Sequence, residues 1–368
     1  MTADTLPTTA PFTGLLPAQL RQVLSDRPAP GSTISLGRLP DGEELLRLYR
    51  MMVVGRAVED AATAMAKQGL MAVYPAARGQ EACQIGAAAA LRRSDWLFPT
   101  YRDSIAVISR GADPADVLGG PLGRRHLGYD PYEQRTAPLC TPLATHAPHA
   151  VGFAHAARHH GDGTIALVLL GEGATSEGDF HAACTFAAAH QAPVVFLVQN
   201  NGYAISTPAH LQSAAPSFAH KGIGYGIPAE RVDGNDVLAV LMTTRAAVER
   251  ARAGAGPALV EAVTYRIGPH TNSDDSTRYR TAAEADPWKQ KDPLDRYAAY
   301  LHDHGLLTPA TTQDAACTAE AEVRKLRLHA QETFVPDPAE ITAHVYTQPP
   351  GHLLAQTARL ALEEDSDG

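Results

Sequence analysis

The sequence predicts an α/β fold, in which a doubly wound, mostly parallel sheet carries helices on both faces. Residues 164–170 and 193–198 are continuous apolar runs, as expected for parallel strands buried on both faces. Between these runs, a glycine-containing turn is followed by residues with helical spacing over 177–190, which makes a βαβ unit. A further helix over 236–253 leads to a third predicted strand over 258–263. Strands that alternate with helices in this way are typical of a doubly wound fold.

The other elements follow from apolar spacing and from glycine and proline. Residues 41–68 carry Leu and Met at helical spacing, and Gly69 offers a stop, so they predict a helix. Residues 292–331 predict another helix, with a charged face in solvent. Segments 119–139 and 265–280 have no hydrophobic period and predict loops. Loops as long as the first are usually functional in compact domains.

These elements predict one domain with an arm at each end. The α/β domain is expected over residues 39–335. Residues 1–38 are rich in Thr, Pro and Ala and predict a flexible N-terminal arm. Residues 336–368 predict a C-terminal arm that lies on the domain or on a partner. A chain of 368 residues with 45% hydrophobic residues is long enough to bury such a core.

Charge and cysteine content exclude several classes of function. The net charge of −9 and the pI near 6.0 argue against a basic surface for nucleic acid or for an acidic membrane. No apolar run approaches the ~20 residues that span a bilayer, and the N-terminus has no pattern of a signal or transit peptide. The four cysteines lack CxxC or zinc-like spacing, so the expected location is a reducing cytoplasm.

Two short polar motifs stand directly after the first two predicted strands. They are Gly171-Glu172-Gly173 and Asn200-Asn201, with 26 residues between them. Ligands of open parallel sheets bind beyond the carboxyl ends of the strands, where both motifs are expected. Each motif alone is weak, because Gly-x-Gly and Asn-Asn are also common turns. Their pairing across a helix and a strand is much more specific.

The chemistry of the two motifs suits a divalent metal ion and a diphosphate. The Glu172 carboxylate, the Asn201 side-chain oxygen and a backbone carbonyl near Tyr203 are hard oxygen ligands, which Mg²⁺ prefers. Two phosphate oxygens and a water molecule would complete an octahedral shell. The glycines beside Glu172 leave room for the diphosphate to approach the backbone.

The paired motifs resemble the fingerprint of thiamine-diphosphate enzymes. The whole stretch 171–206 looks like the α subunit of branched-chain 2-oxoacid dehydrogenases of the bacterial type, and the resemblance extends over about residues 40–350. Further matching segments are 70–91, 100–102, 141–145, 231–237 and 265–280. Most thiamine-diphosphate enzymes carry Asp in place of Glu172. The longer side chain is associated with the branched-chain group, which favours branched-chain 2-oxoacids over pyruvate.

The resemblance implies a site for thiamine diphosphate and Mg²⁺. Metal ligands would be Glu172, Asn201 and Tyr203. The implied cofactor-binding residues are Tyr101, Arg102, Leu143, Gly171, Glu172, Gly173, Ala174, Asn201, Tyr203, Ile205 and His270. Tyr101 and Arg102 would meet the diphosphate, Leu143 would support the bent cofactor, and Ile205 would contact its aminopyrimidine region. His270 is the implied catalytic residue, facing both the diphosphate and the reacting centre.

Several of these residues also have an ordinary structural interpretation. Arg102 suits a structural ion pair, although diphosphate needs a cation and the guanidinium offers a bidentate fork. Tyr101 and Leu143 suit core packing. Val73 and Tyr74 are candidates for the wall of an aliphatic substrate pocket, and ordinary packing explains them equally well.

The resemblance also implies that this chain is half of an active site. No carboxylate in the sequence stands out as the partner of the cofactor's pyrimidine ring. In the family this glutamate belongs to a separate β subunit, and the site lies between chains of an α2β2 tetramer. The α chain alone is therefore expected to be inactive. A lipoylated acyltransferase that receives the acyl group is the implied third partner.

Two enzyme alternatives and one non-enzyme alternative stay open. The chain also fits the α subunit of a pyruvate or acetoin dehydrogenase, or a subunit that only assembles the complex. The Cys140–Thr145 turn, followed by His146, corresponds to a potassium site in some relatives, and the ion is left open here. In mitochondrial relatives the loop after His270 is phosphorylated. The corresponding hydroxyls here would be those of Thr271 and Thr281, and no transit peptide accompanies them.

Overall fold

Five parallel strands form the central sheet, in the order β1-β2-β3-β7-β6. The computed structural model describes residues 20–24, 39–124, 128–332, 335, 337, 339–343 and 345–367. The strands are β1 Trp96–Phe98, β2 Ala166–Gly171, β3 Val194–Asn200, β6 Ala229–Asp233 and β7 Ala258–Val263. Because every pairing in this sheet is parallel, the strands end at a common edge. The three predicted strands are confirmed as β2, β3 and β7, which are adjacent in the sheet.

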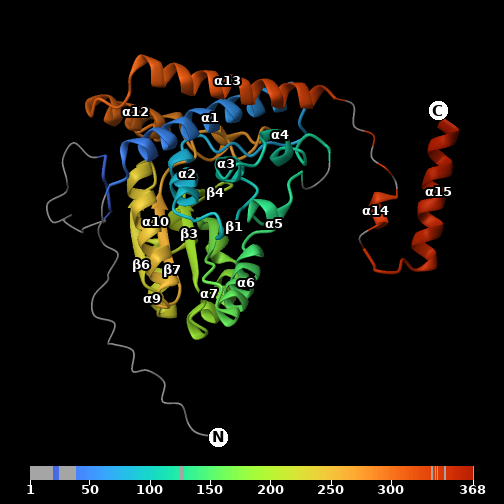
Figure 1. Ribbon diagram of the computed structural model, residues 1–368, viewed down its shortest axis with the longest axis horizontal. Helices are drawn as coiled ribbons and strands as arrows, with labels where there is room; N and C mark the ends of the chain where they lie inside the picture. Colours follow the sequence, from blue (N-terminus) through green and yellow to red (C-terminus); the bar gives the residue numbers. More distant parts are fainter. Residues whose placement is uncertain are drawn as a thin grey trace, which may run out of the picture.

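Helices cover both faces of the sheet, which confirms the predicted doubly wound fold (Figure 1). On β2, Val168 and Leu170 face a core shared with α6 (His146–His160) and α7 (Gly178–Ala189). The side chain of Leu169 points the other way, into a core shared with α10 (Val237–Arg252) and α2 (Glu81–Ala89). Successive side chains of a strand alternate between faces, so a strand buried on both faces reads as a continuous apolar run.

Apart from α10 and α2, which cover the second face of the sheet, the remaining helices are short or pack outside these layers. They are α1 Gly42–Lys67, α3 Ser104–Ser109, α4 Pro114–Val117, α5 Pro131–Gln134, α8 Ala209–Gln212, α9 Lys221–Tyr225, α11 Ala282–Lys289, α12 Pro293–Asp303 and α13 Pro309–Gln331. Short 3₁₀ turns are η1 Glu172–Ser176, η2 Phe218–His220 and η3 Ser276–Arg278, and β4 Tyr203–Ala204 pairs with β5 Thr207–Pro208. Helices α1, α12 and α13 cross one end of the sheet layers (Figure 1).

The single helix predicted over 292–331 is wrong, because the chain forms α12 and α13 there with a turn between them. Gly305 adopts a left-handed φ of 68°, which ends α12. Thr308 then caps α13 with a reciprocal capping box to Thr311. The predicted loop over 119–139 contains only one regular element among its described residues, the four-residue α5.

The segments at the two ends of the chain differ in how they meet the domain. Residues 20–24, within the predicted N-terminal arm, attach to the sheet edge, since Arg21 forms a bridge with Val232 of β6. Helix α14 (Glu340–Ala343) and helix α15 (Gly351–Asp367) stand apart from the domain in Figure 1. The proposed domain boundaries remain a prediction.

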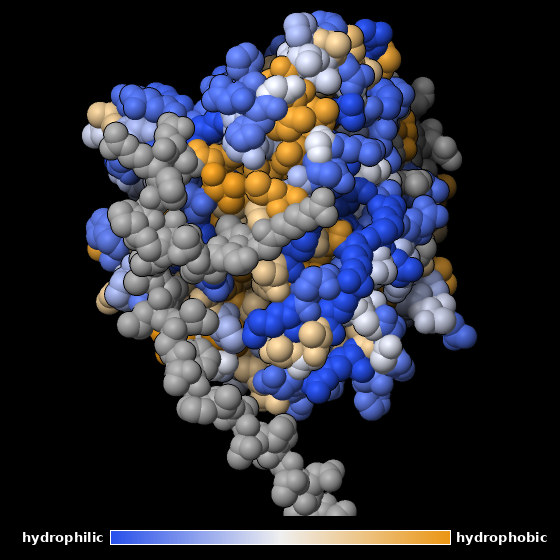
Figure 2. Space-filling model, turned by 60° about the vertical axis from the view of Figure 1, so that its left-hand side comes forward, coloured by the Kyte–Doolittle hydropathy of each residue, from blue (hydrophilic) through white to orange (hydrophobic). Residues whose placement is uncertain are grey.

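The surface is mixed in character. Figure 2 shows a face that is mostly hydrophilic, with a band of hydrophobic residues across its upper half. Among the described residues, no helix combines the length and the hydropathy needed to cross a bilayer.

Candidate functional site

The two polar motifs meet at the edge where β2 and β3 end. Glu172 follows β2 directly, and Asn201 follows β3. The strands pair with Gly171 opposite Gln199, so the residues after them are neighbours. The backbone N–H of Asn201 donates a hydrogen bond to Glu172 Oε2 at 3.1 Å. The side chain of Glu172 is only 1% exposed, so this contact is closed to bulk water.

Glu172 is a buried carboxylate without an ion pair to any described side chain. Burial raises its pKa, while hydrogen bonds from backbone N–H groups and from Gln212 act in the opposite direction. Arg266 also lowers this pKa, but through space and not as an ion pair. A carboxylate held in this way is stabilised by a bound cation. Glu172 therefore fits the metal ligand that the sequence predicts.

The side chain of Asn201 is held in one orientation. Its Oδ1 accepts from the backbone N–H of Tyr203 at 3.2 Å, and its Nδ2 donates to Gln80 Oε1 at 3.1 Å. Arg266 Nη1 donates to the carbonyl of Tyr203 at 3.2 Å. Both Asn201 Oδ1 and this carbonyl retain a second lone pair for a metal ion.

The proposed ligand set contains a single carboxylate. Within the described parts of the chain, no cluster of three or more His, Cys, Asp or Glu side chains is suited to hold a metal. An oxygen site completed by phosphate and water, as Mg²⁺ prefers, does not need such a cluster.

The glycines beside Glu172 have different surroundings. A Cβ added to Gly171 would meet no atom within 4 Å, so its face is open to a ligand. A Cβ added to Gly173 would lie 2.7 Å from the Cβ of Ala204, so packing against β4 requires this glycine. Ala174, which follows, is buried. Gly171 therefore fits the predicted approach of a diphosphate, and Gly173 holds the turn against β4.

Arg102 and His270 are in direct contact, although 168 positions separate them in the sequence. Arg102 Nη2 lies 2.9 Å from His270 Nδ1 and 3.1 Å from the His270 carbonyl. Arg102 Nη1 donates to the carbonyl of Ala76 at 2.6 Å. A guanidinium only donates, so Nδ1 is the acceptor and the ring proton is on Nε2. His270 thus has its Nε2–H available to donate.

The surroundings of His270 keep its ring neutral. Burial, together with the positive charges of Arg102 and Arg266, lowers its pKa from 6.5 to about 4, and Asp274 opposes this shift. At neutral pH the side chain is therefore a hydrogen-bond donor without charge. Arg102 supplies the positive charge beside it.

Three residues that support His270 and the Asn201 turn were not singled out from the sequence, although the matching segment 265–280 contains them. Asp274 Oδ2 accepts from the backbone N–H of His270 at 2.7 Å and from Tyr279 OH at 2.5 Å. Arg266 Nη2 donates to Tyr279 OH and to the carbonyl of Ile205. The sequence did offer a signal for two of them, because Arg266 and Asp274 lie within four positions of the candidate catalytic residue His270.

The other predicted cofactor residues lie around this network. The Tyr101 ring meets the His270 ring edge-on, with 6.1 Å between ring centroids. Ile205 has a left-handed φ of 56° and a side chain that is 54% exposed. Leu143 is 43% exposed and precedes Ala144, which is also left-handed. Non-glycine residues held in this conformation cluster at functional sites.

Val73 and Tyr74 have different environments. Tyr74 is buried in the core cluster around α1, and its hydroxyl donates to Glu59 Oε2 at 2.8 Å. For Tyr74, the structure therefore favours ordinary core packing over the wall of a substrate pocket. Val73 is 45% exposed and is free to line a pocket.

The candidate phosphorylation sites and the candidate potassium site lie in turns around this network. Thr281 is exposed and precedes α11, and Thr271 Oγ1 lies 3.2 Å from Ser273 Oγ. His146 is buried, with Nε2 2.7 Å from the carbonyl of Leu169. The Cys140 carbonyl accepts from the backbone N–H of Tyr101.

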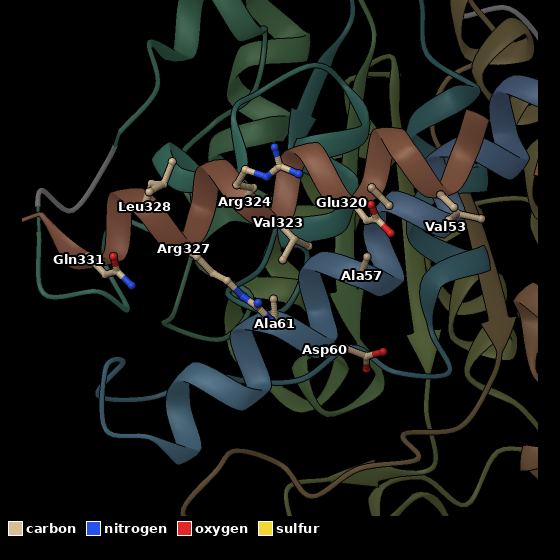
Figure 3. Close-up of a pocket in the computed structure, with 12 residues that line it drawn as sticks. Val53, Ala57, Asp60, Ala61, Glu320, Val323, Arg324, Arg327, Leu328 and Gln331 are labelled. Atoms are coloured by element: carbon tan, nitrogen blue, oxygen red, sulfur yellow. The ribbon is translucent and has the colours of Figure 1, made fainter. Parts of the chain in front are cut away.

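A separate groove of about 730 Å³ lies between α1 and α13 (Figure 3). Its lining residues are Val53, Ala57, Asp60, Ala61, Ala316, Ala319, Glu320, Val323, Arg324, Arg327, Leu328 and Gln331. None of them belongs to the network around Glu172, Asn201 and His270, so the chemistry of the site does not reside in this groove.

The chain is similar to known proteins over most of its length. A family model described as the dehydrogenase E1 component matches residues 49–339. The chain is 46% identical to a 3-methyl-2-oxobutanoate dehydrogenase subunit alpha of Mycobacterium tuberculosis, over 87% of this chain and 88% of the relative. It is 36% identical to the mitochondrial 2-oxoisovalerate dehydrogenase subunit alpha of Dictyostelium discoideum, over 86% and 75%. It is 34% identical to a pyruvate dehydrogenase E1 component subunit alpha of Staphylococcus aureus, over 92% and 91%.

Proposed function

The chain belongs to the dehydrogenase E1 component family, and from this premise we propose that it is the α subunit of a branched-chain 2-oxoacid decarboxylase. The reaction is the oxidative decarboxylation of substrates such as 3-methyl-2-oxobutanoate, with reductive acylation of a lipoyl-lysine. The observation that carries the proposal is the buried Glu172 carboxylate in hydrogen-bond contact with Asn201, at the edge where β2 and β3 end.

The donor set supports binding of Mg²⁺ and thiamine diphosphate. The Glu172 carboxylate, Asn201 Oδ1 and the Tyr203 carbonyl would hold the metal, and its charge would help to bind the diphosphate. The open face of Gly171 gives the diphosphate access to the backbone. When bound, thiamine diphosphate supplies the electron sink for decarboxylation.

The residues around His270 supply a positive charge, from Arg102, and an oriented hydrogen-bond donor, the Nε2–H of His270. Arg102 and the neutral Nε2–H of His270 would bind anionic oxygens of the cofactor and orient the reacting group. Asp274 fixes the His270 backbone, so the ring keeps this orientation without becoming charged. These residues therefore act through binding and orientation.

A β subunit would complete the site. The proposed partner supplies the glutamate that acts on the pyrimidine ring, in an α2β2 tetramer that delivers acyl groups to a lipoylated acyltransferase. The hydrophobic band in Figure 2 is of the kind that binds a partner protein. The α subunit names of the relatives support the same assignment.

The substrate separates the branched-chain proposal from a pyruvate or acetoin dehydrogenase. Glu172 and the 46% identity to a 3-methyl-2-oxobutanoate dehydrogenase subunit support the branched-chain proposal, and the pyruvate-type relative is 34% identical. With reconstituted α and β chains, we expect a higher kcat/KM for 3-methyl-2-oxobutanoate than for pyruvate. A preference for pyruvate would overturn the branched-chain assignment.

A subunit that only assembles the complex would not need Glu172. We therefore expect Glu172→Ala to abolish Mg²⁺-dependent binding of thiamine diphosphate, measured by calorimetry on the α/β complex, while the complex still assembles. Unchanged binding would favour the non-catalytic alternative.

A further inference from the structure

Gln80 is a buried side chain that uses only half of its amide. It stands immediately before α2 and is 1% exposed. Its Oε1 accepts from Asn201 Nδ2 at 3.1 Å. Its Nε2 is buried, and no described residue accepts a hydrogen bond from it. A buried donor without an acceptor is costly, so this amide indicates a missing ligand.

The orientation of the Gln80 amide follows from the backbone. The N–H of Tyr203 donates to one end of the Asn201 amide, and that end must be Oδ1. Asn201 therefore turns Nδ2 to Gln80, and Gln80 must accept with Oε1. Turning the Gln80 amide over would place two N–H₂ groups against each other. Nε2 is therefore the end of Gln80 that remains unpaired.

The backbone next to Gln80 is fixed, so the side chain has little freedom to retract. Gly79 has a left-handed φ of 94°, and an added Cβ would lie 2.6 Å from the Tyr265 carbonyl oxygen. The Gly79 carbonyl accepts from Thr264 Oγ1 at 2.8 Å. Residue 80 is thus tied to the segment that continues from β7 toward His270.

We propose that Gln80 is a further cofactor-binding residue, whose Oε1 sets the orientation of the Asn201 amide and whose Nε2 donates to a diphosphate oxygen of thiamine diphosphate. This inference rests on the proposed function. Gln80 directly contacts Asn201, whose Oδ1 is one of the proposed Mg²⁺ ligands, so Gln80 stands beside the proposed cofactor site. An anionic oxygen is also the acceptor that stabilises a buried N–H most strongly.

Two substitutions separate the roles of the two ends of the amide. Gln80→Glu has nearly the same shape and still accepts from Asn201 Nδ2, but its ionised form has no donor and repels a diphosphate. Gln80→Leu removes both contacts. Gln68→Glu and Gln68→Leu make the same changes at an exposed glutamine and serve as controls.

Binding is measured by calorimetry with Mg²⁺ and thiamine diphosphate on the reconstituted α/β complex, and assembly is checked by size and thermal unfolding. We expect both Gln80 variants to lose affinity by about tenfold to a hundredfold, and the Gln68 controls to match the wild type. If Gln80→Leu does not assemble, Gln80→Glu carries the test.

Unfolding of the cofactor-free complex distinguishes a cofactor contact from a merely structural role. A structural role would lower its melting temperature, whereas loss of a cofactor contact lowers affinity and reduces the stabilisation that bound Mg²⁺ and thiamine diphosphate add. We expect Gln80→Glu, which keeps the acceptor for Asn201, to show the second pattern. Wild-type affinity for both Gln80 variants, or a loss for Gln80→Glu that the melting temperature of the cofactor-free complex fully accounts for, would overturn the inference. Failure of the wild-type complex to bind would instead overturn the proposed function.

Discussion

His270 is a neutral donor because of the residues that touch it. Arg102 takes Nδ1, and burial with the charges of Arg102 and Arg266 lowers the pKa to about 4. The unfolded side chain has the ordinary pKa of 6.5, so it binds a proton first as pH falls. The contribution of the neutral ring to stability is therefore complete above about pH 6.5 and is lost as pH falls toward about 4.

This pH dependence is open to direct measurement. We expect the melting temperature of the cofactor-free α/β complex to fall more steeply between about pH 6.5 and about pH 4 for the wild type than for His270→Asn. Asn keeps an acceptor for Arg102 near the position of Nδ1 but does not titrate. Parallel pH profiles for the two proteins would contradict a neutral, depressed His270.

At the scale of residues, the sequence predicted that the two polar motifs lie close together. Glu172 and Asn201 follow predicted strands, and neighbouring strand ends bring them into contact. Their role in binding a metal stays a prediction. The Arg102–His270 contact joins positions 168 apart, which no local pattern contains. The family resemblance implied only that both residues face the diphosphate. The role of Gln80 depends on an amide that is unpaired only in three dimensions.

At the scale of elements, the two glycines of the turn after β2 have different structural roles. Gly171 has open space where a side chain would stand, whereas Gly173 packs against Ala204. Sequence alone treats the two glycines alike, because their difference arises from the position of β4. The structure therefore predicts that the same substitution lowers stability at Gly173 and weakens cofactor binding at Gly171.

We expect Gly173→Ala to destabilise the chain by about 1–3 kcal/mol through overpacking. Gly171→Ala should leave stability within about 0.5 kcal/mol but weaken binding of Mg²⁺ and thiamine diphosphate. Chemical denaturation and calorimetry on the two variants measure both quantities. A Gly171→Ala protein with wild-type cofactor affinity would argue against a diphosphate at this turn.

Helices and strands were predictable from the sequence where all of their faces are equally buried. The strands β2, β3 and β7 read as apolar runs because both of their faces are covered. The break between α12 and α13 was missed, because Leu306 and Leu307 continue the apolar pattern across the Gly305 turn into the same core. The apolar pattern of a sequence shows which residues are buried, but it does not show that the chain turns between two helices.

At the scale of the molecule, Asp236 ties residues 23 and 24 to the start of α10. Its carboxylate accepts from the backbone N–H groups of Val23 and Leu24, both at 2.6 Å, and also caps α10 through Ala239. The described part of the predicted N-terminal arm is therefore attached. Its composition gave no sign of this contact, because the partner lies more than 200 positions away.

Replacing this carboxylate tests the attachment. Asp236→Ala should cost more than the about 1 kcal/mol typical of a helix cap, because two further N–H groups lose their acceptor. Asp41→Ala removes only the cap of α1 and serves as the control. Equal destabilisation of the two variants, measured by denaturant unfolding, would show that the contact with residues 23 and 24 contributes nothing.

The central claim is that this chain supplies the metal and diphosphate half of a shared active site. The most direct test is to assay decarboxylation of 3-methyl-2-oxobutanoate, with Mg²⁺ and thiamine diphosphate, by the α chain alone, by its β partner alone and by the mixture. We predict turnover in the mixture only, and its loss when the α chain carries Glu172→Ala. Turnover by the α chain alone, or by a mixture that contains Glu172→Ala, would contradict the account.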